Sequence, residues 1–235
     1  LSSLPLRRVS GFDSFPHQDR WPFTVASIRT VLNQGINFSP LTLIIGENGT
    51  GKSVLLESIA EAFGFPLEGG TLAEQRDSIE DNQACGNYLQ LVRGASGTRN
   101  GLFFRAETVH SLQGYLQSVG SSRGSKLLRQ SHGESALSLI DSVPAGQGLW
   151  IFDEPESGLS FQGQLNLIHR LLEHLRGGGQ VILCTHSPIL MGMDDDAQIL
   201  EVGEWGDRET VFENIEDVTL WRSFLQAPDR FMQHF

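Results

Sequence analysis

The chain has 235 residues, of which 39% are hydrophobic and 19% are charged, a composition typical of a globular protein and not of a disordered or coiled-coil one. Its formal net charge is −11, and the acidic excess is one-sided, because residues 1–130 sum to +1 and residues 131–235 to −12. These values disfavour attraction of the whole surface to nucleic acid or anionic lipid, and no apolar run approaches the roughly 18 residues that a membrane-spanning helix needs.

The first clear unit along the chain is a strand, a loop and a helix. Residues 41–45, Leu-Thr-Leu-Ile-Ile, are apolar at both ends and rich in β-branched residues, which predicts a short buried strand. Residues 53–63 carry apolar side chains at helical spacing, among them Leu55 and Ile59. The glycine-rich residues 46–51 join the two, so we predict a tight loop between a strand and the start of a helix.

This loop matches the pattern G-x-x-x-x-G-K-[ST] over residues 46–53. Glycines let backbone N–H groups approach a phosphate, and the free amides and positive end of the following helix favour the same anion. Lys52 supplies a cation for the β- and γ-phosphates, and the hydroxyl of Ser53 is a candidate Mg²⁺ ligand. The candidate nucleotide-binding residues here are Glu47, Asn48, Gly49, Thr50, Gly51, Lys52, Ser53 and Val54.

The middle of the chain is richer in glycine, serine, asparagine and arginine than the segments around it. Within it, residues 102–104 form an apolar run that predicts a strand, and residues 107–118 have a helical pattern. We interpret residues 64–144 as a smaller, partly helical lobe. It is inserted into a nucleotide-binding core of about residues 1–63 and 145–235, so that the whole chain is one domain.

Residues 131–135, Ser-His-Gly-Glu-Ser, lead into an apolar helix predicted at 134–142. Ser131 is a candidate N-cap, and Glu134 three residues later completes a capping box, which is a purely structural interpretation. Alternatively, this helix N-terminus, with Ser131, Gly133 and Glu134, points at the γ-phosphate of a nucleotide. Both interpretations are open at this point.

Residues 149–152 form an apolar strand that ends in two carboxylates, Asp153 and Glu154. Adjacent acids at the end of a buried strand are costly unless they meet a cation or a reacting water. Asp153 is therefore a candidate ligand of Mg²⁺, and Glu154 is a candidate base that polarises the attacking water. The alternative is an ordinary acidic turn after a strand.

Further helices are predicted at residues 161–175 and 216–226, and a further strand at 181–184. His186 follows that strand, 33 positions after Asp153, where it is placed to sense a γ-phosphate. A histidine after a strand can also have only a structural role. Strands that alternate with helices in this way predict a mainly parallel sheet covered on both faces.

Four motifs in this order resemble the ABC ATPase superfamily. They are GENGTGKS at 46–53, SHGES at 131–135, LWIFDEPESGLS at 149–160 and CTHSP at 184–188. The resemblance covers about residues 41–190. It implies a Walker A loop, a signature motif, a Walker B strand followed by a D-loop, and a switch histidine, in that order.

By this resemblance, the fold class is α/β, an ABC-type P-loop NTPase. It implies a mainly parallel sheet flanked by helices, a small partly helical lobe and an N-terminal antiparallel β portion. The resemblance also implies ATP and Mg²⁺ as cofactors, Glu154 and His186 as catalytic residues, and Asp153 with Ser53 as metal ligands. Two protomers would enclose two ATP molecules, each capped by the signature helix of the partner.

The sequence departs from the pattern of transporter subunits at two motifs. His132 precedes the single Gly133 where a Gly-Gly pair is usual, and Ser160 ends the D-loop where an aspartate is common. From Lys52 to Ser131 there is no heptad pattern, hence no coiled-coil arm. The chain is thus more similar to stand-alone bacterial ATPases related to chromosome-maintenance and recombination ATPases.

Two positions of the family's site have only weak candidates. For the Q-loop residue, which is usually glutamine, these are Glu107 and Gln83. For the aromatic residue that stacks on adenine, they are Phe15, Trp21 and Phe23, for each of which packing in the core is the simpler explanation.

The leading hypothesis for function is a soluble, Mg²⁺-dependent ATPase that dimerises around ATP and acts on a protein or nucleic-acid client. The first alternative is the nucleotide-binding subunit of an ABC transporter. A small-molecule P-loop kinase is a third possibility, but it leaves the signature and switch motifs unexplained.

The expected compartment is the cytoplasm, because the two cysteines, Cys85 and Cys184, belong to no C-x-x-C pair and indicate a reducing environment. A local basic patch for nucleic acid is one hypothesis, and a solvated surface is the simpler one. The candidate patches are Arg93, Arg99 and Arg105, or Arg123, Lys126 and Arg129.

Overall fold

The computed structural model describes residues 4–12, 19–67, 69–71, 85–95, 100–106, 132–203 and 206–233. The strands are β1 (Leu6–Gly11), β2 (Ile36–Asn37), β3 (Leu41–Ile45), β4 (Gly70–Thr71), β5 (Leu89–Arg93), β6 (Gly101–Arg105), β7 (Leu149–Asp153), β8 (Gln180–Cys184), β9 (Gln198–Gly203) and β10 (Gly206–Thr210). The α-helices are α1 (Ala26–Asn33), α2 (Lys52–Phe63), α5 (His132–Asp141), α6 (Phe161–Arg176), α7 (Pro188–Met191), α8 (Glu216–Gln226) and α9 (Pro228–Met232).

The main sheet has seven strands in the order β10-β9-β3-β8-β7-β6-β4. The five central strands are parallel, while β10 and β4 run antiparallel at the two edges. Because the central strands are parallel, the carboxyl ends of β3, β8 and β7 lie at one edge of the sheet. The segments that follow these three strands therefore meet, although they are far apart in the sequence.

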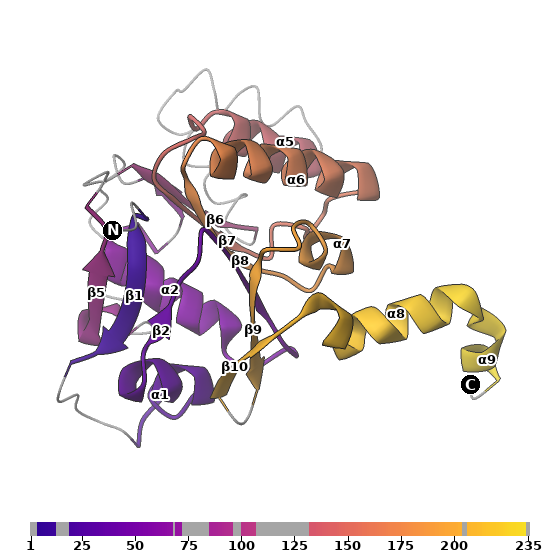
Figure 1. Cartoon of the computed structure of the whole chain (residues 1–235), viewed down its shortest axis with the longest axis horizontal. Helices are drawn as coiled ribbons and strands as arrows, with labels where there is room; N and C mark the ends of the chain where they lie inside the picture. Colours follow the sequence, from indigo (N-terminus) through magenta and orange to yellow (C-terminus); the bar gives the residue numbers. More distant parts are fainter. Residues whose placement is uncertain are drawn as a thin grey trace.

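Helices cover both faces of this sheet, with α1 and α2 on one side and α5, α6 and α7 on the other (Figure 1). The alternation of side chains along β7 explains this arrangement. Leu149 and Ile151 belong to the core under α1 and α2, and Trp150 and Phe152 belong to the core under α5 and α6. All four are fully buried, so β7 has no solvent-facing side.

A second sheet of three strands, in the order β2-β1-β5, is antiparallel and includes the N-terminal part of the chain. It is tied to the main sheet by Gln180, the first residue of β8. The side chain of Gln180 accepts a hydrogen bond from Leu6 N at 2.8 Å and donates one to Leu6 O at 2.7 Å. The predicted α/β class, with a mainly parallel sheet and an N-terminal antiparallel portion, is confirmed.

Most elements predicted from periodicity are present with nearly the predicted bounds. These are β3, β6, β7, β8, α2, α5, α6 and α8. The helix predicted at 107–118 lies outside the described residues. Sequence reasoning did not identify α1, nor the β9–β10 hairpin, whose second strand has the polar sequence Gly-Asp-Arg-Glu-Thr at the edge of the sheet.

The division into a core and a lobe stays a prediction, because much of residues 64–144 lies outside the described part of the chain. Three strands within that range are described. β6 and β4 extend the main sheet, and β5 pairs with β1. The sheets of the core therefore draw on this range as well as on the two segments that we assigned to the core.

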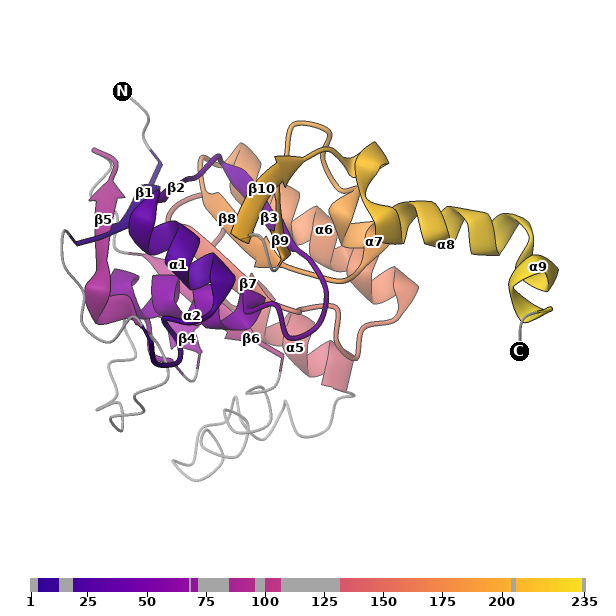
Figure 2. The same ribbon diagram turned by 90° about the horizontal axis from the view of Figure 1, so that it is seen from below.

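The helices α8 and α9 extend away from the rest of the chain in both views (Figures 1 and 2). Of α8, only Val218 is buried, while Trp221 and Leu225 are 51% and 70% exposed. Among the residues that the structure describes, no helix is both long enough and apolar enough to cross a membrane.

Asp207 on β10 is a buried carboxylate that makes the stability of the fold depend on pH. Burial raises the pKa of Asp207 from 3.8 to about 7, and neither carboxylate oxygen has a hydrogen-bond partner among the described residues. The folded protein thus holds a proton there that the unfolded chain releases near pH 4. Since the folded state binds more protons between about pH 4 and 7, Asp207 costs stability progressively as the pH rises through that range.

The variant Asp207→Asn removes this titration. We expect it to unfold at the same denaturant concentration as the native sequence at pH 4, and to be more stable by roughly 2–4 kcal/mol at pH 8. Urea unfolding followed by circular dichroism at both pH values measures the difference, in which the contributions of all other titrating groups cancel. A difference that does not change with pH would contradict the prediction.

Candidate functional site

The loop predicted to bind phosphate lies between β3 and α2, and two of its glycines are required by close packing. Gly46 has a φ of 140°, and a Cβ there would lie 2.2 Å from the carbonyl oxygen of Val202 on β9. Gly51 has a φ of 94°, and a Cβ there would lie 2.2 Å from a methyl group of Val25, just before α1. Only glycine fits at either position without displacing these neighbours.

Lys52 is the first residue of α2, and only 5% of it is exposed. Its Nζ donates hydrogen bonds to Gly46 O at 2.9 Å and to Glu47 O at 2.7 Å. The ammonium group therefore lies within the turn of the loop, where the helix N-terminus also favours an anion. The side chain of Glu47 is exposed, so any contact of Glu47 with phosphate falls to its backbone.

Ser53 and Asp153 are 100 positions apart in the sequence and are adjacent in the structure. The Oγ of Ser53 donates a hydrogen bond to Asp153 Oδ1 at 3.1 Å. Asp153 ends β7 and is 7% exposed. A hydroxyl and a carboxylate are the oxygen ligands that Mg²⁺ prefers, so this pair fits the metal predicted from the sequence.

Arg105, at the end of β6, lies beside Ser53 and Asp153. The sequence alone did not predict Arg105 at this site. It pairs with Asp153 in the parallel register of β6 and β7, and its Nε lies 3.9 Å from Asp153 Oδ2. It also forms an ion pair of 2.7 Å with Glu57 of α2. No local signal in the sequence reveals this contact, because it depends on the pairing of two strands about 50 residues apart.

The position of Arg105 removes one member from the first of the two candidate basic patches, while Arg93 is exposed. Arg105 faces Glu57 and Asp153 and is not on an open surface. Arg93 donates a hydrogen bond to Phe63 O at 2.9 Å, and its guanidinium lies 4.3 Å from the centre of the Phe63 ring. The remaining candidates, Arg99, Arg123, Lys126 and Arg129, lie outside the described residues.

The two predicted catalytic side chains meet at the ends of β7 and β8. Nε2 of His186 lies 3.4 Å from Oε1 of Glu154, although this contact lacks hydrogen-bond geometry. Both side chains remain accessible, with 30% of His186 and 42% of Glu154 exposed. Glu154 has a φ of 47°, a conformation that costs energy for a residue with a Cβ, and its N–H donates to Cys184 O at 3.0 Å.

The predicted signature and D-loop motifs are neighbours within one chain. Gly133, in the first turn of α5, packs so closely on the loop after β7 that a Cβ would lie 2.8 Å from Gly158 O. Ser160, where the family often has aspartate, accepts a hydrogen bond from Gly163 N at 3.1 Å and so caps α6. Ser131 and the side chain of Glu134 lie outside the described residues.

The candidates for the aromatic residue that stacks on adenine differ in their burial. Phe23 is 6% exposed and packs edge-on against Tyr88 with ring centres 5.2 Å apart, as expected for a core residue. Trp21 is 51% exposed. Phe15, Gln83 and Glu107 lie outside the described residues.

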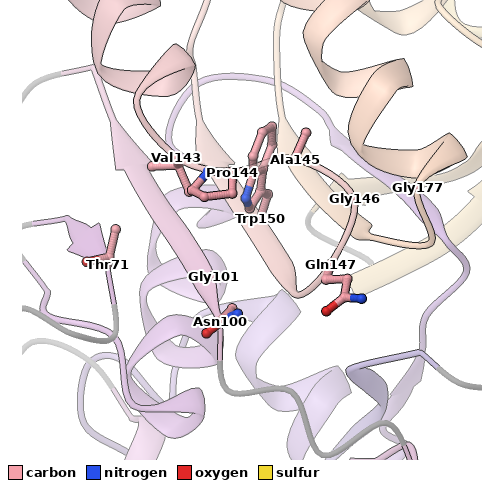
Figure 3. A pocket seen from close by; sticks show the side chains of 10 residues that line it. All are labelled: Thr71, Asn100, Gly101, Val143, Pro144, Ala145, Gly146, Gln147, Trp150 and Gly177. Atoms are coloured by element: carbon pink, nitrogen blue, oxygen red, sulfur yellow. The ribbon is translucent and has the colours of Figure 1, made fainter.

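A cavity of about 500 Å³ lies at the other end of the sheet (Figure 3). Its lining includes Gly101, which begins β6, and Trp150, the second residue of β7, so it is separated by the length of these strands from Asp153. Trp150 stacks on His174 with ring centres 3.9 Å apart. Burial lowers the pKa of His174 to about 4, and its Nδ1 accepts a hydrogen bond from Gly146 N, so the imidazole is neutral at pH 7.

Two family models match parts of the chain. One, described as "AAA domain, putative AbiEii toxin, Type IV TA system", matches residues 125–192. The other, described as "AAA domain", matches residues 24–95. The second range contains the loop at 46–53, and the first contains the carboxylates after β7 together with His186.

Curated relatives match a larger share of the chain. It is 30% identical over 173 residues to the "Cytochrome c biogenesis ATP-binding export protein CcmA" of Bartonella henselae, an alignment that covers 68% of this chain and 83% of the relative. It is 31% identical over 166 residues to the protein of the same name from Nitrobacter hamburgensis, covering 62% and 78%. Among solved structures, the SMC head domain from Thermotoga maritima aligns with a TM-score of 0.46 at 17% identity, covering 88% of this chain and 99% of that one.

Proposed function

The chain belongs to the ABC-type P-loop ATPases, and on that premise we propose that it binds Mg-ATP and hydrolyses it to ADP and phosphate. The observation that carries the proposal is the contact of 3.1 Å between Ser53 and Asp153, beside a lysine held within the phosphate loop. A hydroxyl, a buried carboxylate and a lysine ammonium at one helix N-terminus match what a metal-bound triphosphate requires.

Each residue of the site has a proposed task. The backbone N–H groups of residues 47–54 and the ammonium of Lys52 bind the β- and γ-phosphates. Ser53 and Asp153 would hold Mg²⁺, which would neutralise charge on the phosphates. Glu154 polarises the attacking water, and His186 contacts the γ-phosphate.

The test is the release of inorganic phosphate by the purified chain. We expect release with Mg²⁺ and ATP, and none after chelation with EDTA, because the phosphates and the carboxylates would then repel each other without a metal between them. Phosphate transferred to a metabolite, with none released to water, would indicate a kinase and overturn the proposal. No nucleotide binding at all would overturn it as well.

We also propose that ATP joins two copies of the chain head to tail. The support is the family resemblance of residues 131–135, in which Ser131, Gly133 and Glu134 of one protomer would reach the γ-phosphate held by the other. Hydrolysis would then release the contact, and opening would act on a protein or nucleic-acid client in the cytoplasm.

A second candidate function is the nucleotide-binding subunit of a membrane transporter. It is favoured by the printed name of the curated relatives, "ATP-binding export protein". The departures at His132 and Ser160 from the pattern of transporter subunits disfavour it. Affinity purification of the tagged chain from solubilised membranes distinguishes the two, because only a transporter subunit would retain an integral membrane protein in stoichiometric amount.

A further inference from the structure

Glu156 lies between the two loops that carry the proposed catalytic side chains, although no step of the proposed reaction uses it. Its Oε1 accepts three hydrogen bonds from the loop after β8. The donors are Thr185 Oγ1 at 2.7 Å, His186 N at 2.6 Å and Ser187 N at 3.1 Å. One carboxylate oxygen thus binds the three successive residues whose centre is His186.

These hydrogen bonds provide acceptors for backbone N–H groups that follow the end of β8. β8 ends at Cys184, so the N–H groups of His186 and Ser187 no longer have a neighbouring strand as acceptor, and buried N–H groups need one. The other oxygen, Oε2, is buried and has no hydrogen-bond partner among the described residues. All the hydrogen bonds between the Glu156 side chain and the loop after β8 are therefore made by Oε1.

The loop is anchored on its far side as well. Ser187 Oγ donates to Gln164 Oε1 of α6 at 2.5 Å and accepts from Ile189 N, which caps α7. The backbone of His186 therefore has a fixed element on each side. Its imidazole, which makes no hydrogen bond with Glu154, is placed by this backbone.

Glu156 belongs to the same turn as Glu154. Ser157 N donates to Glu154 O at 3.1 Å, and the φ of 47° at Glu154 gives the turn its direction. By binding the backbone of His186, Glu156 ties that residue to the turn that carries Glu154. The two groups that lie 3.4 Å apart, the imidazole of His186 and the carboxylate of Glu154, are thus carried by the two segments that Glu156 joins.

We propose that Glu156 is a positioning residue that fixes His186 beside Glu154 through the backbone of the loop after β8. The inference rests on the proposed ATPase function, because it assigns a role to Glu156 within that site. It gives a role to Glu156, the third acid of the run Asp-Glu-Pro-Glu at residues 153–156, which the proposed hydrolysis does not itself require.

The test compares Glu156→Ala with Glu156→Gln. The alanine variant removes the acceptor, and we expect kcat to fall by roughly 10- to 100-fold with KM within about threefold, since a displacement of about 1 Å at a catalytic group has such an effect. The glutamine variant keeps an oxygen that can accept the same three bonds, and we expect kcat within about threefold of the native value. Glu213→Ala, which removes an exposed carboxylate elsewhere, serves as the matched control.

A double variant separates positioning from an independent effect. If Glu156 acts through His186, Glu156→Ala has no further effect on kcat in a His186→Ala background. Effects that multiply in the double variant would overturn the proposal, as would equal losses in the alanine and glutamine variants. If the alanine variant does not fold, Thr185→Val is tested in its place, because it removes one of the three hydrogen bonds to Glu156. We expect kcat of Thr185→Val to fall by roughly threefold or more, and a native kcat would overturn the proposal.

A measurement without turnover keeps this inference separate from the proposed function. The imidazole signal of His186, assigned with His186→Ala in ¹H–¹³C spectra, reports the surroundings of the ring in nucleotide-free protein. We expect Glu156→Ala to shift it and to abolish its response to Glu154→Gln, whereas Glu156→Gln leaves both unchanged. An unshifted signal overturns the positioning role, while absence of phosphate release from the native chain overturns only the ATPase.

Discussion

Replacing Glu154 with glutamine is expected to lower the rate of phosphate release by roughly 10²- to 10⁴-fold and to leave the affinity for ATP within about threefold. Glutamine keeps the size of the side chain and removes the negative charge that polarises the attacking water. Because 42% of the Glu154 side chain is exposed, the substitution leaves no buried group without a partner. The loss therefore falls on the chemical step and not on folding or binding.

Phosphate release at saturating Mg-ATP and equilibrium binding of a fluorescent ATP analogue measure the two quantities. Glu213→Gln is a matched control, since it neutralises an exposed carboxylate outside the proposed site. Native turnover in Glu154→Gln would contradict the role of Glu154 as base. Loss of binding in the same variant would show that the side chain acts on the nucleotide and not on water.

The same variant tests the dimer. An enzyme that binds ATP but does not hydrolyse it should accumulate in the ATP-bound state, so we expect Glu154→Gln with Mg-ATP to elute as a dimer on a sizing column and to be monomeric with ADP. A monomer at high protein concentration and saturating Mg-ATP would contradict the proposed head-to-tail assembly.

Replacing Lys52 with methionine is expected to weaken ATP binding by roughly 30- to 1000-fold. The substitution keeps most of the aliphatic stem and removes the ammonium, which donates to two carbonyls of the phosphate loop and is placed to bind phosphate oxygens. Charge-assisted hydrogen bonds are worth about 1.5–3 kcal/mol each, and a 30- to 1000-fold loss corresponds to about 2–4 kcal/mol, which lies within the cost of losing one or two of them.

Isothermal titration with Mg-ATP measures the affinity, and circular dichroism checks that the variant is folded. Arg176→Met is a suitable control, because it removes a positive charge from an exposed position at the C-terminal end of α6, away from the loop. If Lys52→Met binds ATP with native affinity, the phosphate loop is not part of the nucleotide site. If Arg176→Met loses as much affinity as Lys52→Met, the loss reflects net charge and not a local contact.

The charges that lie close to the proposed metal site would also affect its affinity for Mg²⁺. Arg105 lies near Asp153, and Glu57 pairs with Arg105, so Asp153 sits in a network of opposite charges and not alone. A cation bound by Ser53 and Asp153 would share its carboxylate with Arg105, whose Nε lies 3.9 Å from Asp153 Oδ2. The arginine thus moderates the negative charge of the site before metal arrives.

Local elements and their chemistry could be read directly from the sequence. Residues 41–63 were predicted as a strand, a phosphate loop and a helix because glycine freedom and apolar spacing act over neighbouring residues. The strands β6, β7 and β8 were found for the same reason, since strands buried on both faces are short apolar runs. β10 was missed because an edge strand with a polar sequence carries no such signal.

The contacts that complete the candidate site come from tertiary structure. The strand order places β8 between β3 and β7, which sets His186 beside Glu154 and Ser53 beside Asp153. The ion pairs of Arg105 and the hydrogen bonds of Glu156 to the loop after β8 cannot be predicted from any local sequence pattern. Both sets of contacts depend on which strands become neighbours, and packing over the whole core decides the order of the strands. The spacing of residues along one strand carries no information about its register with a partner strand.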